Sequence, residues 1–170
     1  MKKVVHLPFL VILSLVLSLS SCGDDDGDSA PLPDVEGPDL SQTVIWSGAA
    51  LTFEKTIGSD PSLAENQDRI TDNVWITRAN GAGQIYNAVT ENSANKDLSP
   101  AGTLWAIGTT ANLQNLDFDR FRAALGKPKD RVGVDLVMLL VEDNIAIDVK
   151  FTSWSQQQVG GFRYERSTAP

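Results

Sequence analysis

The sequence predicts a mainly β domain, either an antiparallel β-sandwich or a jelly-roll-like fold, with one short helix. Three observations support this prediction: short apolar runs alternate with a period of two, turn-forming residues separate them, and a single segment has helical spacing. Many short strands joined by turns are typical of sandwiches and jelly rolls. The chain has one cysteine, so no disulfide can form within it, and its hydrophobic core must hold the fold.

The first expected strands are short runs of β-branched and aromatic residues. They are residues 43–46, 51–54, 74–78, 85–89 and 104–108. Because Ser47-Gly48-Ala49-Ala50 separates the first two runs, we expect these to form a short strand pair. Asn80-Gly81-Ala82-Gly83 is a strong turn signal, so residues 85–89 are expected to be the strand that returns after residues 74–78.

One segment follows a helical period instead. Its apolar side chains fall at Phe118, Phe121, Ala124 and Leu125, which is the spacing of one helix face. Aspartates stand at its front and Gly-Lys-Pro follows it, matching the residues that start and stop helices. We therefore expect one short helix over residues 116–125.

The clearest hairpin joins a continuous apolar run, residues 135–141, to an alternating run that begins at residue 145. The core-facing set of the second run is Ile145, Ile147, Val149 and Phe151. The wetter set is Ala146, Asp148, Lys150 and Thr152. Continued alternation would place Trp154 with the wetter set, on the opposite face from Phe151. Residues 160–166 form a further alternating strand.

The first 21 residues are expected to be a signal peptide, because a basic start precedes an apolar run that is short for a membrane span. Leu19-Ser20-Ser21-Cys22 resembles the lipobox of bacterial lipoproteins. That resemblance implies that Cys22 carries acyl chains such as palmitate and becomes the mature N-terminus, which would hold the protein on a membrane. The alternative is a plain signal peptide that leaves a free thiol.

An acidic run follows at Asp24, Asp25, Asp26 and Asp28. It resembles the signal that sends lipoproteins of the Bacteroidota to the outer face of the outer membrane. The alternative is a solvated spacer, the usual role of a block of like charge. Residues 22–40 are expected to form a disordered acidic tether, because they contain too little apolar surface to fold. Within it, Ser29 matches a short O-glycosylation sequon.

Residues 41–170 are expected to form a single extracytoplasmic domain. They contain 15 acidic and 12 basic residues, a net charge of −3. No stripe or cluster of Lys and Arg stands out, so nucleic acid is not an expected partner. The only histidine, His6, lies in the signal peptide, which excludes Ser-His-Asp and Cys-His catalysis in the mature domain. We expect no cofactor.

Three kinds of chemistry remain open. A carboxylate pair could hydrolyse a glycoside, a Tyr, Lys or Arg could act as a base on a sugar acid, and oxygen ligands could hold Ca²⁺. The calcium candidates are Asp68 and Asp72, in an expected loop rich in Asn and Asp. The alternative for that loop is capping, since Asn and Asp side chains bond to nearby backbone.

Four tryptophans suggest a sugar-binding surface, because an exposed indole can stack on a pyranose. Trp46 and Trp75 lie among Val and Ile and are expected to be packed. Trp154 lies among polar residues and is the better candidate for an exposed platform. The candidate ligand platform is Trp154, Lys150, Tyr164 and Arg163.

Several segments resemble a module that recurs in secreted and cell-surface proteins of the Bacteroidota. They are residues 66–78, 105–110, 148–154 and 160–166. The resemblance covers the chain from about residue 42 and implies an extracellular β-rich module. It implies no activity and no catalytic residues.

The sequence thus predicts a lipoprotein of the outer membrane, exposed at the cell surface, with a non-catalytic binding or structural domain. The expected partners are the membrane, through the lipid anchor, and an extracellular glycan or a surface protein complex. The alternative is a histidine-free enzyme that acts on extracellular polysaccharide.

Overall fold

The structure is a computed structural model that describes residues 37–81 and 83–170. The predicted signal peptide, Cys22, the acidic run and Ser29 lie outside the described residues. In the part of the chain that is described, no helix is long and apolar enough to cross a membrane.

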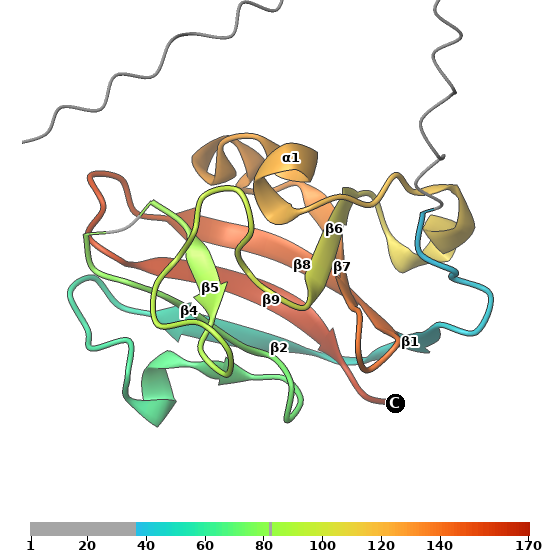
Figure 1. Ribbon diagram of the computed structural model, residues 1–170, viewed down its shortest axis with the longest axis horizontal. Helices are drawn as coiled ribbons and strands as arrows, with labels where there is room; N and C mark the ends of the chain where they lie inside the picture. Colours follow the sequence, from blue (N-terminus) through green and yellow to red (C-terminus); the bar gives the residue numbers. More distant parts are fainter. Residues whose placement is uncertain (1–36, 82) are drawn as a thin grey trace, which may run out of the picture. The chain divides into compact units, whose positions relative to one another are not determined.

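The described residues form two β-sheets (Figure 1). The larger sheet has the strand order β2-β9-β8-β7-β6, and β1 pairs with β8. Its strands are β1 Val44–Trp46, β2 Gly48–Lys55, β6 Thr103–Ile107, β7 Asp135–Leu140, β8 Ile145–Trp154 and β9 Phe162–Thr168. The smaller sheet contains β3 Asp68–Arg69, β4 Trp75–Arg78 and β5 Ile85–Asn87. The prediction of a mainly β, sandwich-like domain is confirmed.

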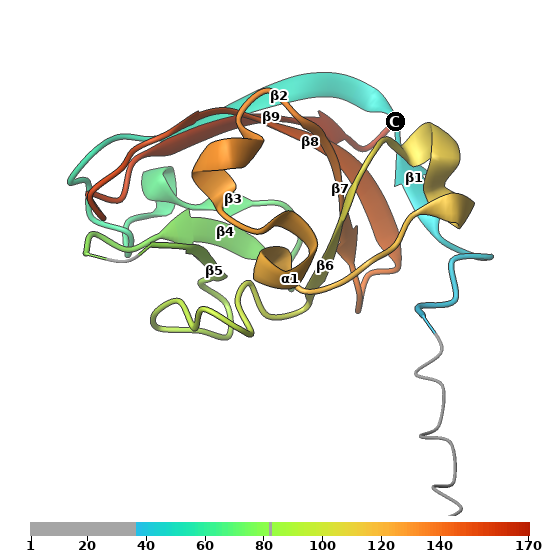
Figure 2. The ribbon, with the colours of Figure 1, turned by 90° about the horizontal axis from the view of Figure 1, so that it is seen from above.

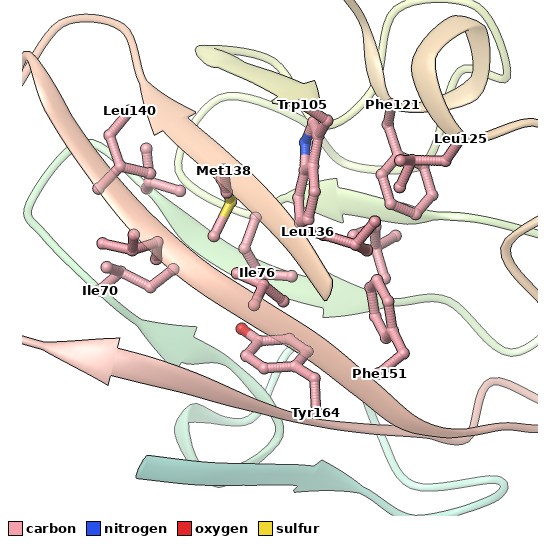
Figure 3. Packing of buried hydrophobic residues seen from close by; sticks show 14 of the residues in the cluster. Ile70, Ile76, Trp105, Phe121, Leu125, Leu136, Met138, Leu140, Phe151 and Tyr164 are labelled. Atoms are coloured by element: carbon pink, nitrogen blue, oxygen red, sulfur yellow. The ribbon is translucent and has the colours of Figure 1, made fainter. Parts of the chain in front are cut away.

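The main core lies between the two sheets (Figure 2). The smaller sheet contributes Ile76 and Ile85, and the larger sheet contributes Met138 and Phe151, all fully buried. Figure 3 shows Trp105 of β6 beside Phe121, with Phe151 below them. The Trp105 and Phe121 ring centroids are 4.9 Å apart in an edge-on arrangement. Such aromatic pairs stabilise a core beyond the area that they bury.

The β7–β8 hairpin forms as predicted, with Met138 opposite Ile147 and Leu140 opposite Ile145. The predicted β4–β5 pair also forms. On β8, the core-facing prediction holds for Ile147, Val149 and Phe151. Ala146 is buried although it was assigned to the wetter face. The reason is a second apolar cluster on that face.

The second cluster covers the outer face of the larger sheet. It contains Leu113, Val137, Leu139 and Ala146, with Leu116 and Phe118 packed against it. Leu113 belongs to a 3₁₀ helix, η2, over Thr110–Asn115. Both faces of β7 are therefore covered, which explains why its sequence is apolar throughout.

The predicted helix over residues 116–125 is shorter than expected. The helix α1 covers only Phe121–Leu125. Before it, Asp119 pairs with Trp105 as an extended bridge, with N···O distances of 2.7 and 3.0 Å. The apolar residues of the segment serve two clusters: Phe118 packs on the outer cluster, whereas Phe121 packs in the main core. One helix cannot contact both faces of a sheet, so the chain stays extended before residue 121.

The expected pairing of the first two strands is wrong. β1 runs parallel to β8, whereas β2 runs antiparallel to β9. Only Ser47 separates the two strands, and the tightest common hairpin needs a two-residue loop. The chain therefore keeps its direction and moves from the edge of β8 to the edge of β9. Gly48 permits this crossing, because a Cβ there would overlap the backbone of Ala169.

A buried ion pair joins the two sheets. Arg166 on β9 donates from Nε to Oδ2 of Asp68 on β3 at 2.7 Å, and from Nη2 to Oδ1 at 2.9 Å. The Tyr164 hydroxyl donates to the same carboxylate at 2.5 Å. Burial, and after it the negative charge of Asp68, raise the pKa of Tyr164 well above its usual value.

Candidate functional site

A β-bulge near the end of β8 sets the direction of Trp154. Phe151 lies opposite Tyr164 on β9, but the next paired residue is Ser153, opposite Arg163. Thr152 is therefore an extra residue, and it shifts the alternation by one position. As a result, Trp154 lies on the same face as Phe151, with ring centroids 5.4 Å apart. The prediction that Trp154 shares a face with Lys150 is wrong for this reason.

The Trp154 ring is half-buried and its face contacts the guanidinium of Arg78. The Arg78 Cζ lies 4.2 Å from the ring centroid, a cation–π geometry. Arg78 is 1% exposed, at the end of β4. Its Nη1 donates to the Gly161 carbonyl at 2.7 Å and to the Ser155 carbonyl at 3.1 Å. Trp154 is thus a packed ring with a partly open side, not a free platform.

Arg78 has no carboxylate partner among the ion pairs of residues 37–81 and 83–170. Its Nε is buried and has no hydrogen-bond partner in the described part of the chain. Burial lowers the pKa of Arg78 to about 10, so the guanidinium stays protonated at neutral pH.

A second buried cation, Lys55, lies near Arg78. Its Nζ donates to the Ser59 carbonyl at 2.8 Å and to Oδ1 of Asn80 at 3.2 Å. Burial, and after it the positive charge of Arg78, lower the pKa of Lys55. Among the described residues, the hydrogen-bond acceptors of these two cations are neutral oxygens, and the Asp60 carboxylate acts on Lys55 only as a nearby charge.

The loop between β8 and β9 has an uncommon backbone. Gln157 and Gln158 have φ of 60° and 58°, in the left-handed region that residues other than glycine rarely adopt. The Gly81 N–H donates to the Gln158 carbonyl at 2.5 Å, and the Gly58 N–H donates to the Val159 carbonyl at 3.0 Å. Two successive left-handed residues cost conformational energy, and such strain gathers at ligand sites.

Beside this loop lies a pocket of about 220 Å³, which we call the Trp154 pocket. Its polar and charged lining consists of Arg78, Arg122, Lys127, Lys129, Ser155, Gln156, Gln157 and Gln158, next to Trp154. Arg122 comes from α1, and the two lysines flank Pro128, where the 3₁₀ helix η3 Pro128–Arg131 begins. On the other side of Trp154 lies a hollow of about 530 Å³, lined by Lys55, Ile57 and Phe162 among others.

The expectation that no cluster of Lys and Arg exists is wrong. Three of the cations are spaced along residues 122–129, on and between α1 and η3, and the fourth, Arg78, comes from β4 of the smaller sheet. A sequence signal was present: five basic residues and a single acidic one lie within residues 120–131. The acidic residue, Asp130, pairs with Lys129 at 3.0 Å.

The other residues of the predicted platform are not brought to this pocket. Tyr164 is fully buried because its strand position faces the core, and it does not line the pocket. Lys150 pairs with Asp135 at 2.6 Å on the other face of the sheet. Arg163 is exposed on β9 but is not part of the pocket lining. Only Trp154 belongs to the pocket.

The two tryptophans expected to be packed are both half-buried. Trp46 packs against the main core. The Arg69 Cζ lies 4.0 Å from the centroid of the Trp75 ring, a cation–π geometry.

The calcium candidates are not arranged as a site. Both Asp68 oxygens accept hydrogen bonds from Arg166, which leaves this carboxylate bound to a cation already. Asp72 is exposed. The loop amides cap backbone instead: the Asn66 Nδ2 donates to the Asp60 carbonyl at 2.7 Å. Within residues 37–81 and 83–170, no three acidic, His or Cys side chains form a metal-binding group.

A separate hollow of about 320 Å³ surrounds Lys150. Three carboxylates line it: Asp135, Asp148 and Glu165. Asp148 accepts hydrogen bonds from the backbone N–H and the hydroxyl of Thr110, at 2.7 and 2.8 Å. These three carboxylates share one hollow, the kind of grouping that a carboxylate-based hydrolysis requires.

Comparison of the chain with protein-family models, with curated proteins and with solved structures finds no match.

Proposed function

We propose that this protein is a lipoprotein of the outer membrane, exposed at the cell surface, whose β-sandwich domain binds a glycan in the Trp154 pocket. One observation supports the binding role above the others: the pocket combines a partly open indole with the amides of Gln156, Gln157 and Gln158. Amides both donate and accept hydrogen bonds, and indoles pack on apolar sugar faces, so this lining suits a hydroxyl-rich ligand.

The proposed location at the outer membrane and cell surface rests on the sequence. The lipobox-like run at Cys22 and the acidic run from Asp24 to Asp28 support an anchored, exported chain. A domain held at the surface by a lipid and a tether would meet extracellular polymers, which agrees with a glycan as the ligand.

A glycan array tests the binding role with the full-length chain in detergent. We expect at least one glycan to bind, and Gln156→Ala to weaken that binding about fivefold, because one hydrogen bond contributes about 1 kcal/mol. Gln156 is exposed and has ordinary backbone, so the fold is kept. Gln42→Ala, an exposed glutamine on another part of the domain, is the control and should bind as the wild type does. An array without a hit, or equal binding by both variants, would contradict the proposal.

A histidine-free enzyme is the second candidate, and the three carboxylates around Lys150 favour it. Each glycan that binds should therefore also be tested for cleavage. Glu165→Gln would abolish any cleavage at this hollow without changing binding in the Trp154 pocket. Cleavage that survives Glu165→Gln would place the chemistry elsewhere.

A further inference from the structure

The Trp154 pocket concentrates positive charge on an acidic domain. Its lining contains four cations, Arg78, Arg122, Lys127 and Lys129, and no carboxylate. The domain as a whole has a net charge of −3. Side chains from three separate segments meet at this point, so the positive charge is a product of the fold. Because the domain as a whole is acidic, a general attraction of anions by its surface would not explain the binding of an anion in this pocket.

Arg78 supplies a second, independent observation. It is 1% exposed and lines the pocket, and its buried Nε lacks a hydrogen-bond partner among the described residues. Its Nη1 donates to the Gly161 carbonyl, and its Cζ lies 4.2 Å from the centroid of the Trp154 ring. The guanidinium is therefore fixed before any ligand arrives. A fixed guanidinium suits the paired oxygens of a carboxylate or a sulfate.

We propose that the Trp154 pocket binds the carboxylate or sulfate group of an acidic polysaccharide. Arg78 is the fixed donor, and Arg122, Lys127 and Lys129 surround the charge at the pocket rim. The glutamine amides of residues 156–158 contact the neighbouring hydroxyls. This inference rests on the proposed glycan-binding function and names the class of glycan.

Three dextrans with one backbone test the charge requirement: neutral dextran, carboxymethyl dextran and dextran sulfate. The full-length chain in detergent should bind at least one charged form, and that binding should weaken as salt is added. Neutral dextran should bind at least tenfold more weakly. The two charged forms distinguish a uronate-like ligand from a sulfated one.

Matched variants locate the site. Lys129→Gln should weaken binding of the charged dextran about fivefold. Lys96→Gln is its control, because Lys96 is also an exposed lysine that pairs with the following aspartate. It should change binding less than twofold. Arg122→Gln with Lys127→Gln should weaken binding at least tenfold, and thermal unfolding checks that both variants fold.

Arg78→Lys keeps the charge but removes the planar fork, so it should weaken binding of the charged dextran at least tenfold. Because this residue is buried, its test depends on an unfolding curve showing a folded variant. If Arg78→Lys does not fold, Lys129→Gln and the double variant Arg122→Gln with Lys127→Gln test the proposed site without it.

Each contrary result has a distinct meaning. Equal binding of neutral and charged dextran would overturn the charge requirement but leave glycan binding in place. Equal losses in Lys129→Gln and Lys96→Gln would show general attraction and would also overturn it. Equally tight binding of a single-stranded oligonucleotide would show a polyanion site without sugar recognition. If no dextran binds while the array gives a neutral glycan, only this inference fails; if neither binds, both fail.

Discussion

Phe151 packs against five other aromatic rings, which are those of Trp105, Phe121, Trp154, Phe162 and Tyr164. It is fully buried at the centre of the main core. With no disulfide available within the chain, packing at this residue supports a large part of the stability.

Phe151→Ala should lower the free energy of unfolding by about 3–5 kcal/mol, since truncating a buried Phe loses its burial and leaves a cavity. A typical domain has about 5–15 kcal/mol in total, so the variant would be close to unfolding. Urea denaturation measures the change. Thr152→Ala, at the exposed next position, is the control and should stay within about 0.5 kcal/mol of wild type. A loss below about 1 kcal/mol in Phe151→Ala would contradict the core assignment.

The two tyrosines predict how stability depends on alkaline pH. Burial is the main cause that raises the pKa of both Tyr86 and Tyr164, and these are the only tyrosines in the chain. In the unfolded chain a tyrosine titrates near pH 10. Above about pH 10 the unfolded state therefore holds fewer protons than the folded state, so stability falls as the pH rises and is fully present below that value.

Tyr164→Phe should reduce this alkaline slope by up to about 1.4 kcal/mol per pH unit, the value for one proton. Denaturant curves at several alkaline pH values measure the slope, and tyrosinate absorbance follows the titration directly. The variant also loses a hydrogen bond to Asp68, so its slope, not its absolute stability, is compared with wild type. An unchanged slope would show that Tyr164 titrates normally in the folded chain.

At the scale of elements, the bulge at Thr152 determines which face of β8 Trp154 occupies. Its effect is comparable to that of a strand slip, since one residue reverses every later side chain. The alternation predicts the core positions Ile147, Val149 and Phe151 correctly, misses the burial of Ala146 on the other face, and places Trp154 on the wrong face beyond the bulge.

Inserting one alanine between Ser153 and Trp154 should shift the alternation after the bulge by one position and turn Trp154 away from Phe151. We expect a loss of about 2–4 kcal/mol, within the range for removing a large apolar side chain from a core. The thermal midpoint and near-ultraviolet circular dichroism of the aromatic residues measure this change. Thr152→Ala keeps the extra residue and should leave both unchanged. An insertion variant with the wild-type aromatic spectrum would mean that the strand absorbs the inserted residue elsewhere.

The sequence could predict the elements whose pattern is local. Hairpins β4–β5 and β7–β8 follow from alternation and turn residues, and the core positions of Ile147 and Val149 follow with them. It could not predict that residues 116–125 serve two clusters, because that depends on tertiary packing. Of the Trp154 pocket, the sequence predicts only Trp154 itself. Arg78, Arg122 and the loop glutamines lie too far apart in the sequence for any local pattern to join them.

At the scale of the whole molecule, the domain and its predicted anchor have separate roles. The ion pair between Asp68 and Arg166 links the two sheets beside the main core. The predicted lipid on Cys22 would hold the domain at the membrane, and it lies outside the described residues. The two roles can therefore be tested independently.

Cys22→Ala should release the protein from the membrane or leave it unprocessed, because no other residue can accept the lipobox lipid. Fractionation of cells and metabolic labelling with a palmitate analogue measure the two outcomes. The domain should keep the thermal midpoint of wild type. A variant that is still acylated and membrane-bound would refute the anchor.

Changing Asp24, Asp25, Asp26 and Asp28 to Ala should retain the lipid but lose exposure at the cell surface, if this run is an export signal. Protease accessibility on intact cells measures exposure, with the same assay on lysed cells as the control. Unchanged accessibility would show that the run is only a spacer.

The passage of the chain from β1, which pairs with β8, to β2, which pairs with β9, has a mechanical consequence. Force applied through the N-terminal side of the domain enters at β1 and continues along β2, with one residue between them. β2 ends at Lys55, which lines the hollow beside Trp154. A ligand in the Trp154 pocket, which shares Trp154 and Ser155 with that hollow, would pull close to the far end of the same stretch of chain. The sheet hydrogen bonds lie across the strands, so this tension would load them together in shear instead of opening them one at a time. An anchored domain that holds a polymer would in this way resist being unravelled by flow.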